Sequence, residues 1–281
     1  MLNPLVGRDD EQLLRSEQPK RIAVVGGGPA GMEAAITAAE RGHSVVLYEA
    51  AQLGGQWNLA ALPPGKEHFV KLVSFFRRRL VATGVQVLAK AANAATLIDG
   101  GYDEVILATG AKPAIPPIKG LTKYLWAEVL ENEHLPANSN VVVIGGGLIG
   151  IEIAHKLVGN GNEVTVIEML DEVARGMEAI SKAMTLKDLK AKGVTILVNT
   201  RVTKEDGSSV SFESSSGPAT KNNVDHIIVA TGMKNHNPLT DGTRRQNFLP
   251  RHRRRPPGRQ DQRRDSGRLR PGRSLRVTVP P

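Results

Sequence analysis

Two stretches of this sequence, RIAVVGGGPAG at Arg21–Gly31 and NVVVIGGGLIG at Asn140–Gly150, share one pattern. Each is a short apolar run, typical of a buried β-strand, that leads into the spacing Gly-x-Gly-x-x-Gly. In both, an acidic residue closes the next apolar run 21 residues after the middle glycine. One such match is weak evidence. A match that recurs after 119 residues with the same internal spacing indicates a repeated structural unit.

The residue types in this pattern suit the binding of a dinucleotide. The first glycine permits a tight turn, the second lets a pyrophosphate approach the amides at a helix start, and the third lets the helix pack closely on its strand. These glycines are Gly26, Gly28 and Gly31 in the first copy and Gly145, Gly147 and Gly150 in the second. We therefore predict two dinucleotide-binding turns, flanked by Pro29 and Ala30 and by Leu148 and Ile149.

The two acids, Glu49 and Glu168, end the second strand of each predicted unit. A carboxylate at that place can accept hydrogen bonds from an adenosine ribose, and it repels a 2′-phosphate. The second unit is therefore expected to prefer NADH to NADPH. The alternative, a solvated strand end without a ligand, applies to any single acid but fits the repeated spacing poorly.

Composition narrows the possible functions. The 281 residues include no cysteine, which excludes disulfides, thiolate zinc sites and cysteine-ligated iron–sulfur clusters within this sequence. No apolar stretch is long enough to span a bilayer and the first residues lack a signal-peptide pattern, so we expect a cytoplasmic protein that does not contact membranes. The net charge of +9 comes from 13 arginines between Arg244 and Arg276, because the preceding residues are nearly neutral.

The order of apolar runs and breaks predicts an α/β fold with two Rossmann-like domains, the second inserted into the first. We expect strands at 21–25, 44–48, 85–89, 104–107, 141–144, 163–167, 195–197 and 210–212, and helices at 30–41, 67–83, 148–158 and 181–192. A further apolar strand is expected to lead into Ala230, as the strand at 104–107 leads into Ala108. The predicted domains are a lead-in (1–19), an FAD- or ADP-binding domain (20–112), an NADH-binding domain (113–232), a return segment (233–243) and a disordered tail (244–281). The proline-rich residues 112–120 are predicted to form a crossover poor in hydrogen bonds.

The arrangement resembles flavoprotein reductases of the pyridine nucleotide-disulfide reductase type, in which an NADH domain is inserted into an FAD domain. More narrowly, the segments GGGPAGMEAA, LGGQ with PPGK following, EVILATGAKP and VVVIGGGLIGIE are similar to the C-terminal module of the NADH:flavin oxidoreductases, the family of 2,4-dienoyl-CoA reductase and trimethylamine dehydrogenase. The resemblance covers residues 3 to about 240. It implies hydride transfer between NADH and FAD, a reaction that the cofactors carry out and that needs no catalytic side chain.

The resemblance also implies further cofactor contacts. In the first unit, Gly55, Gln56, Thr109 and Gly110 join the glycine turn and Glu49 as residues that would touch FAD, or ADP as in some members. In the second unit, Glu152, Thr231 and Gly232 join the turn and Glu168 as residues that would touch NADH. Glu152 follows the third glycine by two residues, as Glu33 does in the first unit, and charge compensation at a helix start is an equally simple explanation for both.

The sequence departs from this family in three ways. The family's upstream FMN barrel and its cysteine cluster for an iron–sulfur centre are absent, so we expect a detached C-terminal half. Its electrons are expected to pass to an FMN or iron–sulfur unit that lies on another chain or was lost with the missing half. The family also closes its FAD domain with a strand into Gly-Asp and a helix, where this sequence has the arginine-rich residues 244–281.

The arginine-rich tail has two interpretations. It is a disordered arm that binds nucleic acid or an acidic partner, although it has almost no aromatic residue to stack on bases. Alternatively it is an out-of-frame translation of a GC-rich gene. Codons can be chosen for Arg259–Arg270 so that a one-base shift spells Gly-Lys-Ile-Asn-Asp-Ala-Ile-Arg-Ala-Gly-Tyr, which resembles the family's missing helix. We favour the second interpretation, so nucleic acid is not an expected partner.

Three functions therefore stand at this point. The first is a flavoprotein reductase module, the second a redox-inactive remnant that binds ADP or NAD(H), and the third a nucleic-acid-binding protein that uses the tail. We predict the first, with FAD and NADH as cofactors and no metal site. A thiol–disulfide reductase is excluded because the sequence has no cysteine.

Overall fold

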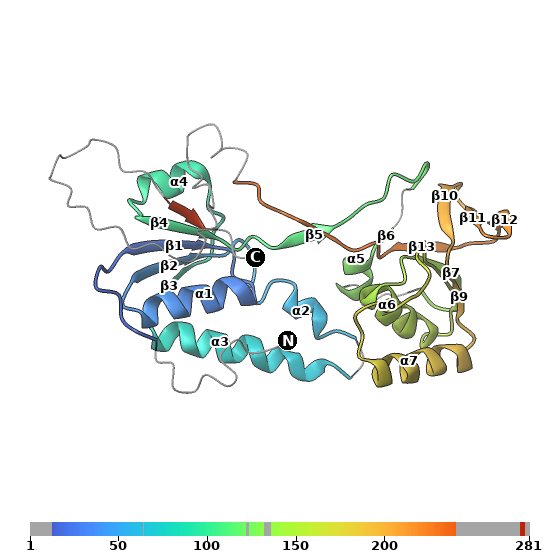
Figure 1. Cartoon of the computed structure of the whole chain (residues 1–281), viewed down its shortest axis with the longest axis horizontal. Helices are drawn as coiled ribbons and strands as arrows, with labels where there is room; N and C mark the ends of the chain where they lie inside the picture. The colour runs from blue at the N-terminus through green and yellow to red at the C-terminus, as the bar shows by residue number, and fades with distance from the viewer. Residues whose placement is uncertain (1–12, 64, 122–123, 132–135, 240–275, 279–281) are drawn as a thin grey trace, which may run out of the picture. The chain divides into compact units, whose positions relative to one another are not determined.

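The structure, a computed structural model, describes residues 13–63, 65–121, 124–131, 136–239 and 276–278. These residues form two compact units with interleaved sequence (Figure 1). Unit 2 comprises Asn58–Val70 and Ala111–Asn235. Unit 1 comprises the described residues up to Trp57, Lys71–Gly110, and those from His236 onward.

Unit 1 is built on a five-stranded parallel sheet with helices on both faces. The strand order is β15-β4-β1-β2-β3, and the strands are β1 (Arg21–Val25), β2 (Ser44–Tyr48), β3 (Gln86–Leu88), β4 (Glu104–Leu107) and β15 (Arg276–Thr278). Helices α1 (Pro29–Glu40) and α3 (Val70–Ala82) lie side by side on one face and α4 (Ala94–Asp99) on the other (Figure 1). Between β2 and α3 lie the short helix α2 (Trp57–Ala60) and a 3-10 turn (Glu67–Phe69).

Alternation along the strands gives unit 1 its two cores. Val24 of β1 and Leu47 of β2 face α1 and α3 and pack with Met32, Ile36 and Leu80. Their neighbours on the same strands, Ala23 and Val46, point to the opposite face. There they pack with Leu97 of α4 and with Val105 and Leu107 of β4. Strands buried on both faces read as continuous apolar runs, which is why the sequence revealed them.

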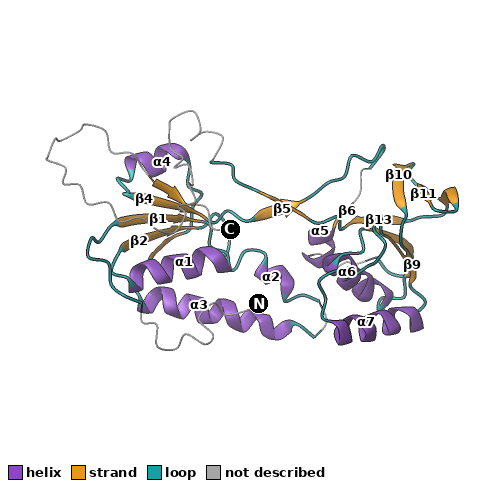
Figure 2. Ribbon diagram, in the orientation of Figure 1, coloured by secondary structure: helices purple, strands orange, loops and turns teal. Residues whose placement is uncertain are grey.

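Unit 2 repeats this architecture with a different cover. Its parallel sheet has the order β6-β13-β7-β8-β9, with β6 (Tyr124–Leu125), β7 (Asn140–Ile144), β8 (Glu163–Ile167), β9 (Thr195–Leu197) and β13 (His226–Val229). Helices α5 (Trp126–Glu131), α6 (Leu148–Val158) and α7 (Ala179–Ala191) cover one face, shown in helix and strand colours in Figure 2. An antiparallel sheet of β10 (Arg201–Glu205), β11 (Val210–Ser214) and β12 (Gly217–Lys221) covers the other.

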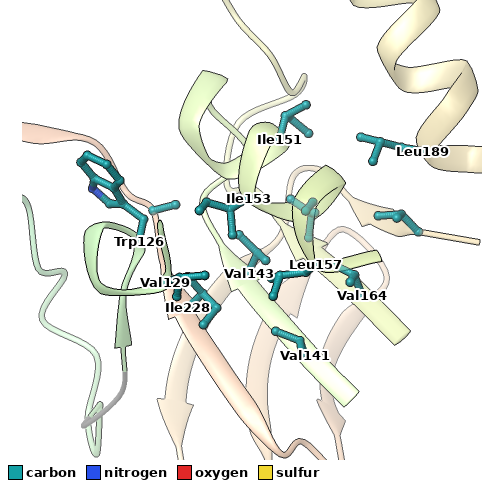
Figure 3. Packing of buried hydrophobic residues seen from close by; sticks show 14 of the residues in the cluster. Trp126, Val129, Val141, Val143, Ile151, Ile153, Leu157, Val164, Leu189 and Ile228 are labelled. Atoms are coloured by element: carbon teal, nitrogen blue, oxygen red, sulfur yellow. The ribbon is translucent and has the colours of Figure 1, made fainter. Parts of the chain in front are cut away.

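The larger core of unit 2 lies between its parallel sheet and its helices. Figure 3 shows Val141 and Val143 of β7 beside Ile153 and Leu157 of α6, all fully buried. The helical face closest to β7 is therefore fixed by apolar packing, and this packing holds the glycine turn between β7 and α6 in place.

Two antiparallel strands mark where the chain passes between the units. Strand β5 (Ala111–Pro113) follows unit 1, and it pairs with β14 (Met233–Asn235), which precedes the return to unit 1. The prediction of a crossover poor in hydrogen bonds was therefore wrong for residues 112–113, because Lys112 and Pro113 take part in this pairing.

The prediction of an α/β fold with two Rossmann-like domains is confirmed. Most predicted elements agree within two residues, but the helix expected at 67–83 starts as a 3-10 turn and becomes α-helical only at Val70. The elements that were not predicted from the sequence are α2, α4, α5, β5, β6, β10, β12 and β14. The predicted disordered tail lies outside the described residues except for Arg276–Thr278, which form β15 instead. No helix of the described part of the chain is long and apolar enough to cross a membrane.

Candidate functional site

The first and third glycines of each motif are required by close backbone packing. Gly26 and Gly145 have φ of 107° and 104°, and a Cβ on them would lie 2.2 Å from the Ala108 carbonyl oxygen and 2.5 Å from that of Ala230. A Cβ on Gly31 or Gly150 would lie within 2 Å of the carbonyl oxygen of the first glycine. No side chain fits at these four positions without moving the backbone.

The middle glycines are different, because no protein atom lies where a side chain would be and so none requires a glycine there. An ideal Cβ on Gly28 or Gly147 has no heavy atom within 4 Å, and both residues have ordinary extended backbone angles. Neither residue caps its helix with a side-chain hydrogen bond. Each turn therefore leaves open space beside the N-terminal amides of α1 or α6, where the helix dipole favours an anion.

The flanking residues complete the helix starts. Pro29 is the first residue of α1, where its missing N–H costs nothing, and Ala30 follows it. Leu148 and Ile149 take the same places on α6, with Leu148 exposed and Ile149 packed against the core.

The two acids are bound to the glycine turns themselves. Glu49 accepts hydrogen bonds from the Gly27 amide at 2.6 Å and the Ala51 amide at 2.7 Å, one on each carboxylate oxygen. Glu168, which is buried, accepts from the Gly146 amide at 2.7 Å and the Leu170 amide at 2.8 Å. These hydrogen bonds could not be predicted from the sequence, because the 21-residue spacing locates each acid but not the amides that it binds.

Sheet order places both turns at a switch point, where neighbouring strands lead to opposite sides. In unit 1 the Gly26 turn follows β1, between β4 and β2, and in unit 2 the Gly145 turn follows β7, between β13 and β8. Ligands of open α/β sheets bind in the crevice at this point, outside the carboxyl ends of the strands.

A loop after each acid folds back onto its turn. In unit 1 the Gly54 amide donates to the Gly27 carbonyl at 2.8 Å, and a Cβ on Gly55 would lie 3.3 Å from the Gly28 Cα. Gln56 follows in the same loop and is exposed. In unit 2 the Ala174 amide donates to the Gly146 carbonyl at 2.7 Å, and Ala174 adopts a left-handed φ of 53° to do so.

The threonines of the two Ala-Thr-Gly segments form hydrogen bonds with the backbone next to strands β14 and β5. Thr109 Oγ1 lies 2.5 Å from the His236 carbonyl oxygen, and Thr231 Oγ1 donates to the Ala114 carbonyl at 2.7 Å. The carbonyls of Gly110 and Gly232 each accept a backbone hydrogen bond at 2.9 Å, from His236 and Ala114 respectively. Ala108 and Ala230, which precede the two threonines, lie against Gly26 and Gly145. The threonine hydroxyl groups themselves bond to backbone carbonyls of this chain.

The two glutamates that follow the third glycines have different partners. Glu152 forms an ion pair with Lys66, and both side chains are partly exposed. Glu33 instead pairs with Arg79 of α3, which also pairs with Glu40, so it joins α3 to α1. Charge compensation at the start of α1 is therefore not the only role of Glu33, because its ion pair with Arg79 also joins two helices. A contact of Glu152 with NADH stays a prediction.

A buried tyrosine pair lies at the end of β2, next to Glu49 in the sequence. Tyr48, the residue before Glu49, lies with its hydroxyl 2.7 Å from that of Tyr102, and both side chains are buried. Burial, followed by the hydrogen bond from Tyr48 to Tyr102, raises the pKa of Tyr48 to about 12. The Tyr48 hydroxyl therefore keeps its proton well above the ordinary tyrosine pKa of 10.0.

Comparison with known proteins agrees with this geometry. Residues 20–251 match the pattern of the family described as pyridine nucleotide-disulphide oxidoreductase, which is most of the chain. The chain belongs to this family. Family membership implies binding of FAD and NAD(P), and it makes the chain an NAD(P)-dependent flavoprotein oxidoreductase module.

Several curated proteins are similar to this family member. It is 39% identical over 213 residues to an NADH oxidase of Thermoanaerobacter brockii, covering 72% of this chain and 33% of that protein. It is 35% identical over 241 residues to a bilirubin reductase of Mediterraneibacter gnavus, covering 83% of this chain and 37% of that protein. The chain thus spans about a third of the length of these relatives.

Solved structures share the fold. A 2-naphthoyl-CoA reductase in complex with 2-naphthoyl-CoA matches with a TM-score of 0.75 and 25% identity, over 85% of this chain and 37% of that one. Histamine dehydrogenase from Rhizobium sp. 4-9 matches with a TM-score of 0.76 at 20% identity, over 84% and 37%, which shows the fold alone. The resemblance to the flavin-dependent reductases inferred from sequence is confirmed.

Proposed function

We propose that the chain is the dinucleotide-binding part of a larger reductase. NADH binds at the Gly145–Gly150 turn and FAD at the Gly26–Gly31 turn. When both are bound, NADH supplies a hydride and FAD accepts it. The chain's own residues bind and orient the two cofactors, and no side chain is needed as a proton donor or acceptor.

The observation that carries this proposal is the emptiness beside Gly28 and Gly147. In each motif the outer glycines are explained by packing within the protein, whereas a Cβ on the middle one would meet nothing. A ligand that occupies that space explains a glycine for which the protein itself gives no steric reason. A pyrophosphate fits there, because it would face the N-terminal amides of α1 or α6.

Glu49 and Glu168 can bind a ribose and still keep their hydrogen bonds to the backbone amides. A carboxylate has about four lone-pair positions, and each of these acids uses one position on each oxygen for an amide. Ribose hydroxyls can donate to the remaining positions. The acid would then connect the sugar to the turn that binds the pyrophosphate.

The electron acceptor lies in the part of the relatives that this chain does not span. The matched residues make up only about a third of these relatives, and the resemblance to NADH:flavin oxidoreductases implies an FMN or iron–sulfur unit. We propose that such a unit receives the electrons in the complete protein.

The alternative is a redox-inactive module that binds ADP or NAD(H). It is favoured by residues 244–281, where the Gly-Asp segment of the flavin domain is replaced by arginine-rich sequence. A flavin site without that segment would hold the adenosine half of FAD and leave the isoalloxazine ring poorly bound.

Anaerobic reduction of the purified chain distinguishes the two functions. The chain is incubated with FAD, freed of unbound flavin and mixed with NADH, and the flavin absorbance is followed. The reductase predicts retained flavin and bleaching by NADH. Retention of ADP and NADH without bound, reducible flavin would establish the redox-inactive module instead.

A further inference from the structure

A buried indole of unit 2 lacks a hydrogen-bond partner. Trp126, the first residue of α5, is 4% exposed, and its ring nitrogen Nε1 is buried. Within the described part of the chain, it is the one buried side-chain nitrogen or oxygen that has no partner. An indole N–H can only donate, so enclosing it without an acceptor costs free energy. A phenylalanine would pack there without burying a donor, so packing alone does not explain this group.

Strand register places Trp126 at the edge of the sheet where the NADH turn lies. The last residues of β6, β13 and β7 pair with one another in register. The residues that follow them are Trp126, Ala230 and Gly145, which therefore form one row at the carboxyl ends of three neighbouring strands. The Ala230 carbonyl lies directly against Gly145. Trp126 thus follows a strand that lies two strands, or about 10 Å, from the strand that leads into the turn.

The Trp126 side chain lies at the margin of the core of unit 2. Figure 3 shows its indole at one end of the cluster between the parallel sheet and the helices, beyond Val129 and Ile153. Three partly exposed residues pack against the same cluster, namely Leu59 of α2, Ile149 of the glycine motif and Met233 of β14. The cluster therefore reaches the surface next to the turn, and the methionine among these residues is unbranched and can move aside for a ligand.

We propose that Trp126 is a cofactor-binding residue whose indole N–H donates to an oxygen of the nicotinamide half of NADH. The inference rests on the proposed function, because it assumes that NADH binds at the Gly145–Gly150 turn. Glu168 follows β8, on one side of β7, whereas Trp126 follows β6, which lies beyond β13 on the other side. A dinucleotide with its adenosine ribose on Glu168 and its pyrophosphate at the turn extends its other half towards β13 and β6.

The nicotinamide half of NADH has the acceptors that this donor needs. Oxygens of its ribose and of its carboxamide group can each accept a hydrogen bond. Because the Trp126 N–H has no partner in the protein, no internal hydrogen bond is lost when the ligand binds. The new bond therefore adds to the affinity for NADH and not to the affinity for its adenosine half.

NMR of the indole N–H groups tests the inference on the intact chain. The chain has two tryptophans, Trp57 and Trp126, and Trp57→Phe assigns their signals. We expect NADH to move the Trp126 indole proton downfield, as a new hydrogen bond does. ADP, which has only the adenosine half and is added at a concentration that displaces NADH, should leave this signal nearly unchanged.

ADP-ribose separates the two possible acceptors, because it has the second ribose but no nicotinamide. A downfield shift with ADP-ribose identifies the ribose as the acceptor, and a shift that requires NADH identifies the carboxamide. Both results support the inference.

Trp126→Phe provides a second measurement, because it keeps an aromatic ring and removes the donor. Calorimetry should show NADH binding weakened about 3- to 10-fold. The affinity for ADP, measured by its displacement of NADH, should change less than about 2-fold. Tyr124→Phe is the matched control: it removes a polar group from an exposed aromatic residue of β6 and should leave both affinities unchanged.

Three results would overturn the inference: NADH binds without moving the Trp126 signal, ADP moves the signal as far as NADH does, or Trp126→Phe weakens NADH and ADP binding equally. In each case, NADH binding by the unaltered chain leaves the proposed function standing. If Trp126→Phe does not fold, the signals of the unaltered chain decide. An unaltered chain that binds neither NADH nor ADP would overturn the proposed function and this inference together.

Discussion

The six motif glycines are the residues that define the two proposed binding turns. Their spacing predicted three separate tasks, and the structure shows a backbone clash at the first and third positions and open space at the second. What spacing could not predict is that Glu49 and Glu168 accept amides of their own turns, because a contact across 22 residues depends on how β1 and β2, or β7 and β8, pair.

Two alanine substitutions in unit 2 should separate binding from stability. Gly150→Ala brings a Cβ within 1.9 Å of the Gly145 carbonyl and should lower the free energy of unfolding by about 3 kcal/mol. Gly147→Ala meets no protein atom and should change that free energy by less than about 1 kcal/mol. It should nevertheless weaken NADH binding at least about 10-fold. Urea unfolding and calorimetry measure the two effects; equal destabilisation by both substitutions would contradict the assignment.

The tyrosine pair makes a prediction about alkaline pH. Tyr48 has a pKa raised to about 12, so the folded state keeps a proton that the unfolded chain loses near its ordinary value of 10.0. This contribution to stability is complete below pH 10 and is lost as the pH rises towards 12. Urea unfolding across this range should show a decline that is smaller in Tyr48→Phe.

Removing one hydroxyl of the pair should cost more than removing both. Tyr102→Phe leaves the buried Tyr48 hydroxyl without its partner and should lower the free energy of unfolding at neutral pH by about 1–3 kcal/mol. The double substitution with Tyr48→Phe leaves no unpaired hydroxyl. Urea unfolding that showed the double variant to be the less stable would argue against the pairing.

Elements were predictable in proportion to their burial. Strands β1, β2, β7 and β8 are apolar throughout because both of their faces are covered, and their boundaries agree closely with the prediction. The missed elements are short, as α4 and β6 are, or half exposed, as β10 and β12 are, and such segments give no sustained periodicity. Strand β15 was missed because its arginine-rich surroundings suggested disorder.

Strand β15 should matter for the edge of the unit 1 sheet. It pairs in parallel with β4 through three residues, so deletion of residues 276–281 leaves β4 at the edge. Hydrogen exchange at the β4 amides is then expected to quicken about 10-fold, with β8 of unit 2 unchanged as the internal control. Unchanged exchange at β4 would mean that the pairing does not contribute to stability.

The two units of the molecule have the same plan, a parallel sheet with a glycine turn after its central strand. Sequence alone predicted the repetition and the family; the two parallel sheets of the structure confirm the repetition, and the family match confirms the family. It could not reveal that Thr109 bonds to the His236 carbonyl and Thr231 to the Ala114 carbonyl, because these contacts join residues more than 100 positions apart.

Hydrogen exchange of the intact chain, measured with FAD alone and with NADH alone, tests the central claim most directly. We predict that FAD slows exchange at residues 26–31 and 49–56, and that NADH slows it at 145–150 and 168–175. Protection of the same turn by both ligands, or of neither turn by either, would contradict the account.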